Sequence, residues 1–473
     1  MAPAQHSLGV RLLSEFVGTY ALVFTMGCVV LTGNAALWCG AFMGTVLMVA
    51  TYALGRVSGA NFNPAVTIAL GAAKALGGPG MTGTNLAAYI CVQLVAGISA
   101  AYSYDLLLDD RFMLAPANDA NVMQMCLVEM LYTCLLCFVV LNCGVARRNS
   151  PNPLYGVAVG CALFAGTCSA GAISGGCFNP AMAVGIDVGN FGFSVQWCLW
   201  YLLAQVVGAL LAAILFRLVR PEDFGGDQCG TGAQLTSEFL GSFVVVVTVG
   251  LDVVEGSVVG VLPIAAAFLC MNLSLGNVSG AQFNPGLTVA TLLSHGAHHD
   301  LEPAMAAWYI VAQLAGGLCA GGAYVTSTGG FAFRPFTDGD HGAAVMGECV
   351  VTCSLCYLVL CLAVGKTRGA AGLGLAMGAC AFANFTSLGE ASNGLMNPAI
   401  SFGISCAGVW ASWPNHNLTG MLTWGAFSAA ELIGSVLAAI AFNLSQAVDL
   451  QEGKDKQHVG PDPFEGAGLF NLR

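Results

Sequence analysis

Charged residues are scarce in this sequence. Only 8% of its 473 residues are Asp, Glu, Lys or Arg, against roughly 25% in an average soluble domain. So few charges exclude an ordinary soluble globular fold, whose water-facing surface carries many more of them. Acidic residues also outnumber basic ones, 25 to 14, and a net charge of −11 offers no basic face to a nucleic acid. We therefore expect no nucleic-acid partner.

Motifs for metal binding and catalysis are also absent. No two CxxC motifs stand at zinc-ligand spacing in a loop, and His298 and His299 form an isolated pair. The 20 cysteines lie mostly in apolar runs, as Cys134 and Cys356 do, where a thiol acts as a small hydrophobic side chain. The sequence has no nucleophile-base set and no glycine loop for phosphate. It therefore predicts no enzyme, no metal and no cofactor.

Long apolar runs are abundant. Hydrophobic residues make up 57% of the chain, and runs near 18 residues or longer recur, as at 127–145 and 199–216. We count about twelve such segments, and the 62 glycines suit close contacts between helices in lipid. The first, near 11–31, is expected to be retained because no basic segment with a cleavage site precedes it. The predicted fold class is an all-α membrane protein embedded in a lipid bilayer.

A short Asn-Pro motif recurs four times, in SGANFNPAVT, SGGCFNPAMA, SGAQFNPGLT and SNGLMNPAIS. One copy would be no more than a capped turn, but four copies at matched spacing favour a function. The motif residues are Asn63, Pro64 and Ala65; Asn179, Pro180 and Ala181; Asn284, Pro285 and Gly286; and Asn397, Pro398 and Ala399.

A glutamate in an apolar segment precedes each motif, and the Asn follows it by 48, 50, 46 and 49 residues. Carboxylates within a membrane are costly and usually have a role. Two roles are open: structural acceptance of loop N–H groups, which we favour, and ion transport. The four glutamates are Glu15, Glu129, Glu238 and Glu348.

The repeat is nested. Asn63 and Asn284 are 221 residues apart, and Asn179 and Asn397 are 218 apart. One unit therefore occurs twice, and each copy consists of two similar quarters. Each quarter offers three spanning helices and one short segment, and because three is odd, successive quarters must be inverted in the membrane. We expect units at 1–222 and 223–448, joined through a polar glycine-rich linker, and a disordered cytoplasmic tail at 449–473.

Basic residues predict the orientation. With a cytoplasmic N-terminus, twelve of the fourteen fall on the cytoplasmic side, and only Arg111 and Arg334 fall outside. Both termini are then cytoplasmic, and the glycosylation sequon at Asn417 lies outside. The plasma membrane and an internal membrane both remain open.

The Asn-Pro segments read as helix starts, because proline suits the first turn and asparagine the cap. The apolar runs at 65–75 and 181–188 are too short to span, and are expected to be re-entrant half-helices. Two half-helices from opposite faces would meet by their N-termini at the midplane, where their dipoles disfavour cations and protons. Each asparagine amide would donate to a passing oxygen and interrupt the proton wire of water.

These glutamate-bearing helices and Asn-Pro motifs resemble the aquaporins, or major intrinsic proteins, over nearly the whole chain, twice. The resemblance implies, for each unit, six helices and two half-helices around one pore for water or small uncharged solutes. Because the family assembles as tetramers, it also implies that two copies of this tandem chain form a homodimer that imitates a tetramer of four pores.

The resemblance further implies a selectivity filter of four residues, one of them an arginine after the second Asn-Pro-Ala. Met182 and Ile400 stand there instead, so neither filter carries a charge. Two consequences are open: a wider aperture that passes solutes such as glycerol, urea, ammonia or peroxide, and a dewetted constriction that conducts poorly. The filter positions are Met43, Thr167, Gly176 and Met182 in the first unit, and Ile264, Phe385, Gly394 and Ile400 in the second.

Other departures from the family pattern bear on function. Ala183 and Ser401 replace the aspartate common in glycerol conductors, which favours water. Gly286 and Asn393 leave open a second unit that is only structural. Cys177 lies two residues before an Asn-Pro motif, where it either faces the first pore and confers block by mercurials or packs elsewhere.

Two further substitutions concern polar positions. Asn61 and Gln282 stand where the family has histidine. Glu431 stands in the last quarter where the other three have a glutamine, at Gln93, Gln205 and Gln313.

Two other functions remain as alternatives. A secondary transporter also has inverted repeats and broken helices, and would show saturable, gradient-coupled flux. A non-conducting or gated structural protein of the same fold is consistent with the altered filters.

Overall fold

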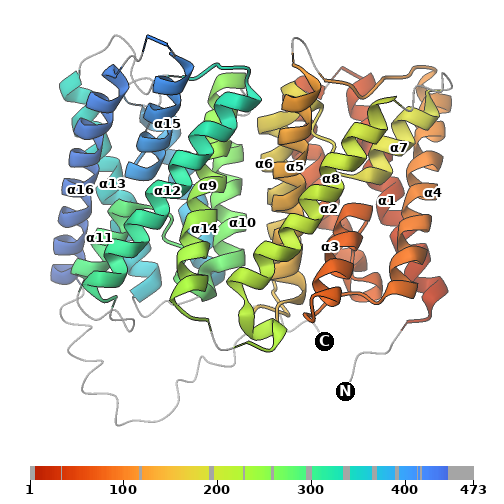
Figure 1. Ribbon diagram of the computed structural model, residues 1–473, viewed down its shortest axis with the longest axis horizontal. Coiled ribbons are helices and arrows are strands. Elements are labelled where there is room, and N and C mark those ends of the chain that lie inside the picture. Colours follow the sequence, from red (N-terminus) through yellow and green to blue (C-terminus); the bar gives the residue numbers. More distant parts are fainter. Residues whose placement is uncertain are drawn as a thin grey trace.

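The computed structural model describes residues 6–33, 35–116, 120–190, 196–226, 229–256, 260–294, 301–333, 341–364, 370–388, 392, 394–412, 414–415 and 418–445. The tail expected at 449–473, the sequon at Asn417, and Arg334 and Asn393 lie outside these residues. Within the described residues the chain is all-helical, with no strand, and its two halves stand side by side (Figure 1).

The first half runs through two quarters, each with three long helices and one short one. The first quarter holds α1 (Leu8–Leu31), α2 (Ala35–Ser58), α3 (Pro64–Ala75) and α4 (Gly83–Leu108). The second holds α5 (Val122–Val140), which ends in the π-helix η1 (Leu141–Val145), then α6 (Tyr155–Ser174), α7 (Pro180–Gly189) and α8 (Gln196–Val219).

The second half repeats this order after the short 3-10 helix η2 (Pro221–Phe224), and the expected unit boundary between residues 222 and 223 falls within η2. The third quarter holds α9 (Thr231–Glu255), α10 (Leu262–Ser279), α11 (Pro285–Leu293) and α12 (Pro303–Ser327). The fourth holds α13 (His341–Val364), α14 (Ala370–Leu388), α15 (Pro398–Ala411) and α16 (Thr419–Ser445).

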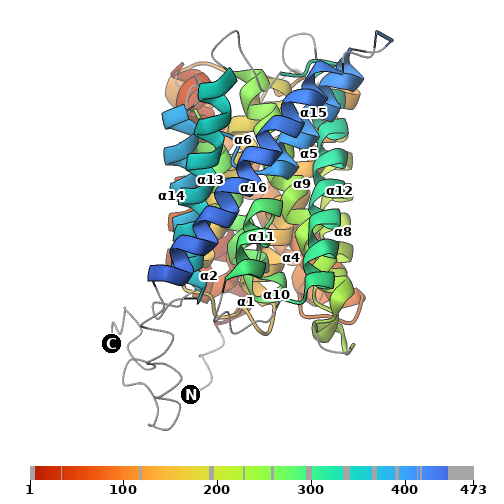
Figure 2. The same cartoon turned by 90° about the vertical axis from the view of Figure 1, so that its left-hand side faces the viewer.

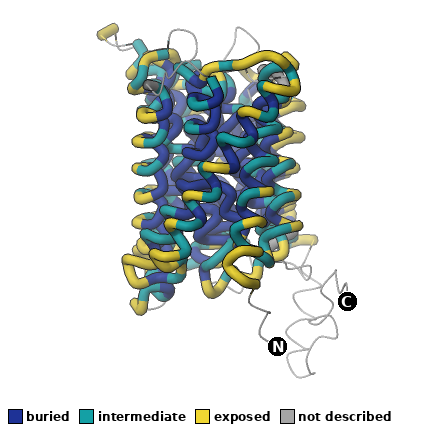
Figure 3. Tube along the Cα trace, turned by 90° about the vertical axis from the view of Figure 1, so that its right-hand side faces the viewer, coloured by how far each residue is buried: buried dark blue, intermediate teal, exposed yellow. Residues whose placement is uncertain are grey.

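The predicted membrane fold is confirmed. Among the described residues, eleven helices are long and apolar enough to span a membrane, and α14, with 19 residues, occupies the twelfth position of the repeat. The four short helices have 12, 10, 9 and 14 residues, too few to cross a hydrocarbon layer about 30 Å thick. Buried residues line the inside of the bundle, and exposed residues face outward and cover both ends (Figure 3).

Each half-helix packs against the third long helix of the opposite quarter of its unit: α3 on α8, α7 on α4, α11 on α16 and α15 on α12. The crossing of α4 with α7 is close because it is made by glycines. A Cβ atom added to Gly97 would overlap the carbonyl oxygen of Ala181, and one added to Gly185 would come within 2.6 Å of the Gly97 oxygen. Small residues therefore allow the half-helices to lie deep inside each unit.

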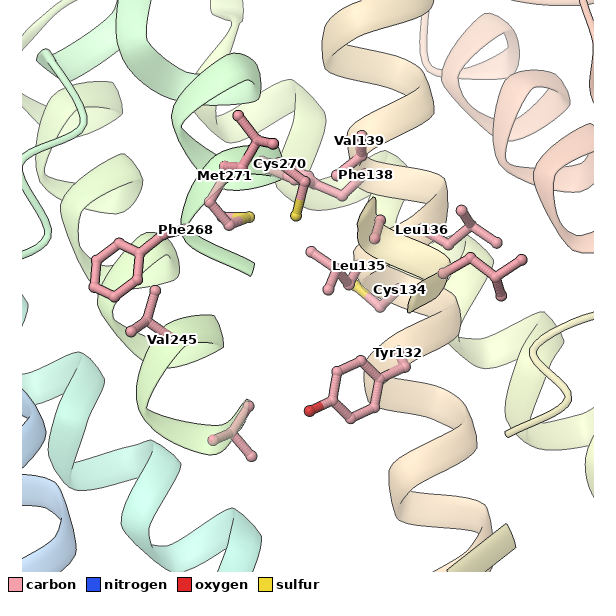
Figure 4. Close-up of a cluster of buried hydrophobic side chains, with 14 of the residues drawn as sticks. Tyr132, Cys134, Leu135, Leu136, Phe138, Val139, Val245, Phe268, Cys270 and Met271 are labelled. Carbon is pink, nitrogen blue, oxygen red and sulfur yellow. The ribbon is translucent and has the colours of Figure 1, made fainter. Parts of the chain in front are cut away.

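The two units share a continuous buried core. Helices α5 and α6 of the first unit pack against α9 and α10 of the second. Figure 4 shows part of this apolar cluster, with Tyr132 and Leu135 on α5 and Cys270 on α10. A polar contact here joins the hydroxyl of Tyr132 to that of Thr248, at 3.1 Å.

A buried arginine links the units at the linker. The Nε of Arg220 donates to Asn142 Oδ1 in η1 at 2.9 Å, and its Nη2 donates to the Ser274 carbonyl and Asn277 Oδ1 in α10 at 2.8 and 2.6 Å. Burial lowers the pKa of the Arg220 guanidinium, which nevertheless stays charged as arginines in proteins do. Arg220 thus holds η1 of the first unit against α10 of the second.

Candidate pore and its half-helix loops

The motif asparagines cap the half-helices. Asn63 Oδ1 accepts the N–H of Ala65 at 2.8 Å, and Asn179 Oδ1 accepts that of Ala181 at 3.0 Å. Proline at the first helical position needs no N–H partner, so the cap satisfies the next free N–H group. Asn284 and Asn397 cap α11 and α15 in the same way.

The asparagine amides also join the two loops of each unit. Asn63 Nδ2 donates to the carbonyl of Phe178 at 2.8 Å, and Asn179 Nδ2 donates to that of Phe62 at 3.0 Å. In the second unit Asn284 donates to the Met396 carbonyl and Asn397 to the Phe283 carbonyl, at 2.8 and 2.9 Å. An amide has two N–H groups, so one remains on each asparagine for a molecule in the pore.

The residue before each motif asparagine adopts the left-handed backbone conformation. The φ angles of Phe62, Phe178, Phe283 and Met396 are 50°, 48°, 52° and 54°. A bulky residue is rarely found there, at a cost of about 1–3 kcal/mol, so surrounding contacts must hold it. The conformation turns each carbonyl toward the opposite loop and each N–H toward a buried carboxylate.

That carboxylate is the repeated glutamate. Glu15 Oε1 accepts the Ser58 hydroxyl at 2.6 Å and the Asn61 N–H at 3.1 Å. Its Oε2 accepts the Phe62 N–H and the Gln93 side-chain amide, both at 2.8 Å. Four donors thus surround one fully buried carboxylate, which is how a charge is tolerated away from water.

Glu129 and Glu238 have the same four kinds of donor, including the amides of Gln205 and Gln313. Glu348 has three among the described residues: the Ser392 hydroxyl and the N–H groups of Leu395 and Met396. This agrees with the structural role favoured for the glutamates.

The serine in this arrangement was not singled out from the sequence. Ser58, Ser174, Ser279 and Ser392 all donate to their glutamates, at 2.6 to 2.7 Å. Each begins one of the four repeated decapeptides, so its recurrence at a fixed distance from Asn-Pro was the available signal.

A cavity lies between the half-helices of the first unit, with an empty volume of about 410 Å³. Asn63 and Asn179 line it, and so does Cys177. Most of the remaining lining is apolar, from α1, α2, α5 and α6, with Asn61 as a further polar side chain. The lumen therefore presents a few polar groups on one side and hydrocarbon on the others.

The expected filter residues of the first unit divide into two pairs. Met43 and Met182 line the cavity. Thr167 and Gly176 contact each other, the Thr167 hydroxyl donating to the Gly176 carbonyl at 3.4 Å, and neither lines the cavity.

The corresponding cavity of the second unit is smaller, about 280 Å³, and is also lined by its two motif asparagines, Asn284 and Asn397. Ile264 and Ile400 do not line it and are fully buried. Phe385 and Gly394 lie against each other, like Thr167 and Gly176.

Two methionines contribute to the lining of this second cavity. Met377 and Met396 line it, and their sulfurs accept hydrogen bonds from the amides of Asn272 and Asn384, at 3.2 and 3.0 Å.

Comparison with known proteins agrees with this geometry. The family model of the major intrinsic proteins matches residues 5–216, 149–252 and 228–442. Nodulin-26 of Glycine max is 33% identical over 229 residues, covering 45% of this chain and 79% of that protein. Aquaporin NIP1-1 of Zea mays is 31% identical, covering 44% and 74%. Aquaporin A of Dictyostelium discoideum is 33% identical, covering 45% and 78%.

Each of these relatives matches slightly less than half of the chain, about the length of one unit, while the family model matches both halves. The half-helix loops and their buried carboxylates occur in all four quarters. The chain is therefore an integral, multi-pass membrane protein of the major intrinsic protein family, the channels for water and small solutes, with two aquaporin-like units in tandem.

Proposed function

We propose that the chain is a passive channel for water and small uncharged solutes, and that the first unit supplies the main pore. The observation that supports this most directly is the first-unit cavity, which reaches from Met43 and Met182 to both motif asparagines. A molecule there meets one free N–H group on each motif asparagine, the side chains of Asn61 and Cys177, and otherwise mostly apolar walls. This is conduction rather than catalysis or coupled transport.

Exclusion of cations and protons rests on the half-helices. The N-termini of α3 and α7 meet at the cross-bonded loops, so their dipoles place positive potential there. The two asparagine amides donate to a water oxygen and orient it, which interrupts proton transfer along the file. No arginine assists them at the filter, because Met182 and Ile400 occupy its position.

We propose that the second unit conducts poorly. Its cavity stops short of Ile264 and Ile400, and its methionines engage nearby amides. Ile264 and Ile400 are fully buried and apolar, and an apolar constriction favours dewetting over conduction. Water is the favoured substrate of the first unit, since Ala183 stands where glycerol conductors commonly have aspartate.

We also propose that two chains form a dimer with four pores in a ring. Within one chain, α5 and α10 lie at the contact between units and have 78% of their spans buried. Their repeat counterparts α13 and α2 have only 39% buried. Figure 2 shows α14 and α2 on the same side of the molecule, away from α8 and α12.

A second copy related by a two-fold axis would cover α13 and α14 of one chain with α1 and α2 of the other, repeating the contact already made within the chain. Mass measurement in lipid nanodiscs tests this, and a monomeric mass at all protein-to-lipid ratios contradicts it.

The proposed orientation has both termini in the cytoplasm. If α1 begins on the cytoplasmic side, the alternating directions of the long helices put seven of the eight basic residues in the described part of the chain on that side. Only Arg111, after the end of α4, falls on the other side.

Stopped-flow light scattering on proteoliposomes tests the channel function. We expect fast shrinkage after a shock with an impermeant sugar, and slow recovery after a shock with glycerol. Rapid glycerol recovery would assign a solute pore instead. Rates equal to those of empty vesicles in both shocks would overturn the proposal and favour a structural protein.

A further inference from the structure

The fourth quarter differs from the other three in the side chain at one buried position. In the first three quarters a glutamine amide donates to Oε2 of the repeated glutamate, at 2.8 to 2.9 Å. At the same position of the fourth quarter stands Glu431, on α16, beside Glu348 on α13. Glu348 Oε2 keeps the Met396 N–H, and no described residue supplies the second donor that its three counterparts have.

Glu431 is fully buried and only partly satisfied. Its Oε1 accepts the N–H of Asn397 at 2.9 Å. Its Oε2 has no hydrogen-bond partner among the described residues, and the whole residue is 0% exposed. A buried carboxylate oxygen without a donor costs much more than an exposed one.

Among the residues that the structure places, no fixed cation compensates the two carboxylates. Helices α11, α13, α15 and α16 contain no lysine or arginine. The titratable groups near Glu431 are Glu348 and the thiol of Cys356, both on α13; α11 has none, and α15 has only Cys406. Glu390, close in sequence, lies outside the described residues. Two like charges in one buried site are unfavourable unless one is neutralised.

We propose that Glu348 and Glu431 form a proton-binding site that holds one proton, carried on Glu431 Oε2 and donated to Glu348 Oε2. The proton comes from water, forms one O–H bond, and removes one of the two charges. It supplies the donor that glutamine supplies in the other quarters. A metal ion fits less well, because the oxygens of Glu348 already accept three donors.

The site couples proton binding to the loop before α15. Glu348 accepts the N–H groups of Leu395 and Met396, and Glu431 accepts that of Asn397, so both carboxylates hold one loop. Loss of the proton places two charges against each other behind this loop. The folded fourth quarter therefore loses stability as pH rises, because folding binds the proton. The proton site itself does not depend on whether the second unit conducts.

The sharpest test replaces Glu431 with glutamine, the residue at this position in the other three quarters. Infrared spectra of the full-length chain in nanodiscs are expected to show the carbonyl stretch of a buried protonated carboxylic acid at neutral pH. Glu431→Gln should abolish this band while the chain stays folded. Thermal unfolding of the wild type should shift to lower temperature with rising pH, and the shift should be smaller in Glu431→Gln.

The matched variant Gln313→Glu builds the same pair around Glu238 in the third quarter. It should add a second band of the same kind and increase the pH dependence of unfolding, and it keeps the test valid if Glu431→Gln fails to fold. Absence of the band in the wild type, its persistence in Glu431→Gln, or no new band in Gln313→Glu would overturn the proposal.

Discussion

At the scale of single residues, the sequence identified which side chains form the site but not which groups their hydrogen bonds join. The repeated Asn-Pro motifs indicated helix caps and a pore, and the asparagines do cap and line the cavities. The donation from Asn63 to the Phe178 carbonyl, 115 residues away, could not be predicted, because it depends on how two inverted quarters meet. The four serines of the carboxylate sites were overlooked, although their recurrence at a fixed distance from Asn-Pro was visible in the sequence.

Blocking one pore at a time separates the two units. Met43→Trp fills the first-unit cavity, and should reduce water permeability of proteoliposomes at least about tenfold, the effect of a barrier raised by about 1.4 kcal/mol. Ile264→Trp is the matched change in the second unit and should leave permeability nearly unchanged. Stopped-flow rates, normalised to the amount of folded protein, give the water permeability of each variant. A loss in Ile264→Trp but not in Met43→Trp would assign the main pore to the second unit.

Cys177 should confer sensitivity to mercurials. Its thiol lines the first-unit cavity and donates to the Asn179 carbonyl at 3.3 Å, so a mercury adduct would occupy the lumen. Water flux of the wild type is expected to fall on treatment with mercury chloride and to recover with a thiol reductant. Cys177→Ser should be insensitive, whereas Cys134→Ser, outside the cavity, should stay sensitive. Block that persists in Cys177→Ser contradicts this assignment.

At the scale of helices, length and hydropathy were enough to predict which segments are long and which are short, and a proline marked the start of each half-helix. The sequence left open where each half-helix packs. Glycine decides this at Gly97, where α4 approaches α7 without a side chain between them, and again at Gly317, where α12 approaches α15.

The α4–α7 crossing should not tolerate even one methyl group. Gly97→Ala places a Cβ against the Ala181 carbonyl and should lower the free energy of unfolding by about 1–3 kcal/mol. Gly171→Ala is the control, because nothing lies within 4 Å of a Cβ there, and alanine is favoured over glycine in helices by about 0.5–1 kcal/mol. Unfolding measurements in mixed micelles compare the free energies of unfolding of the two variants. Equal values would show that α4 and α7 can move apart to accept the methyl group.

At the scale of the whole molecule, the two units behave as one packed body. The core continues from α5 and α6 into α9 and α10, and Arg220 joins η1 to α10 through three hydrogen bonds. The linker predicted as polar and glycine-rich therefore contains a buried cation with a structural role.

Removing that cation should weaken the contact between units. Arg220→Gln leaves the buried acceptors on Asn142 and Ser274 without their charged donor, at a cost of about 1–3 kcal/mol for each one left unpaired. Arg217→Gln is the control, because Arg217 is exposed. We expect a lower midpoint of thermal unfolding for Arg220→Gln alone. Equal midpoints would indicate that apolar packing by itself holds the units together.

The sequence alone determined the membrane fold, the four quarters, their inversion and the residues at the centre of each. It could do so because hydropathy, helix length and helix capping are local properties, and a repeat shows them four times. Only the tertiary structure decided which loop each asparagine bonds, which filter residues reach a cavity, and which carboxylate lacks a donor. These depend on distances between segments about 30 to 120 residues apart, where a difference of one side chain, such as Glu431 for glutamine, changes the chemistry without altering the pattern.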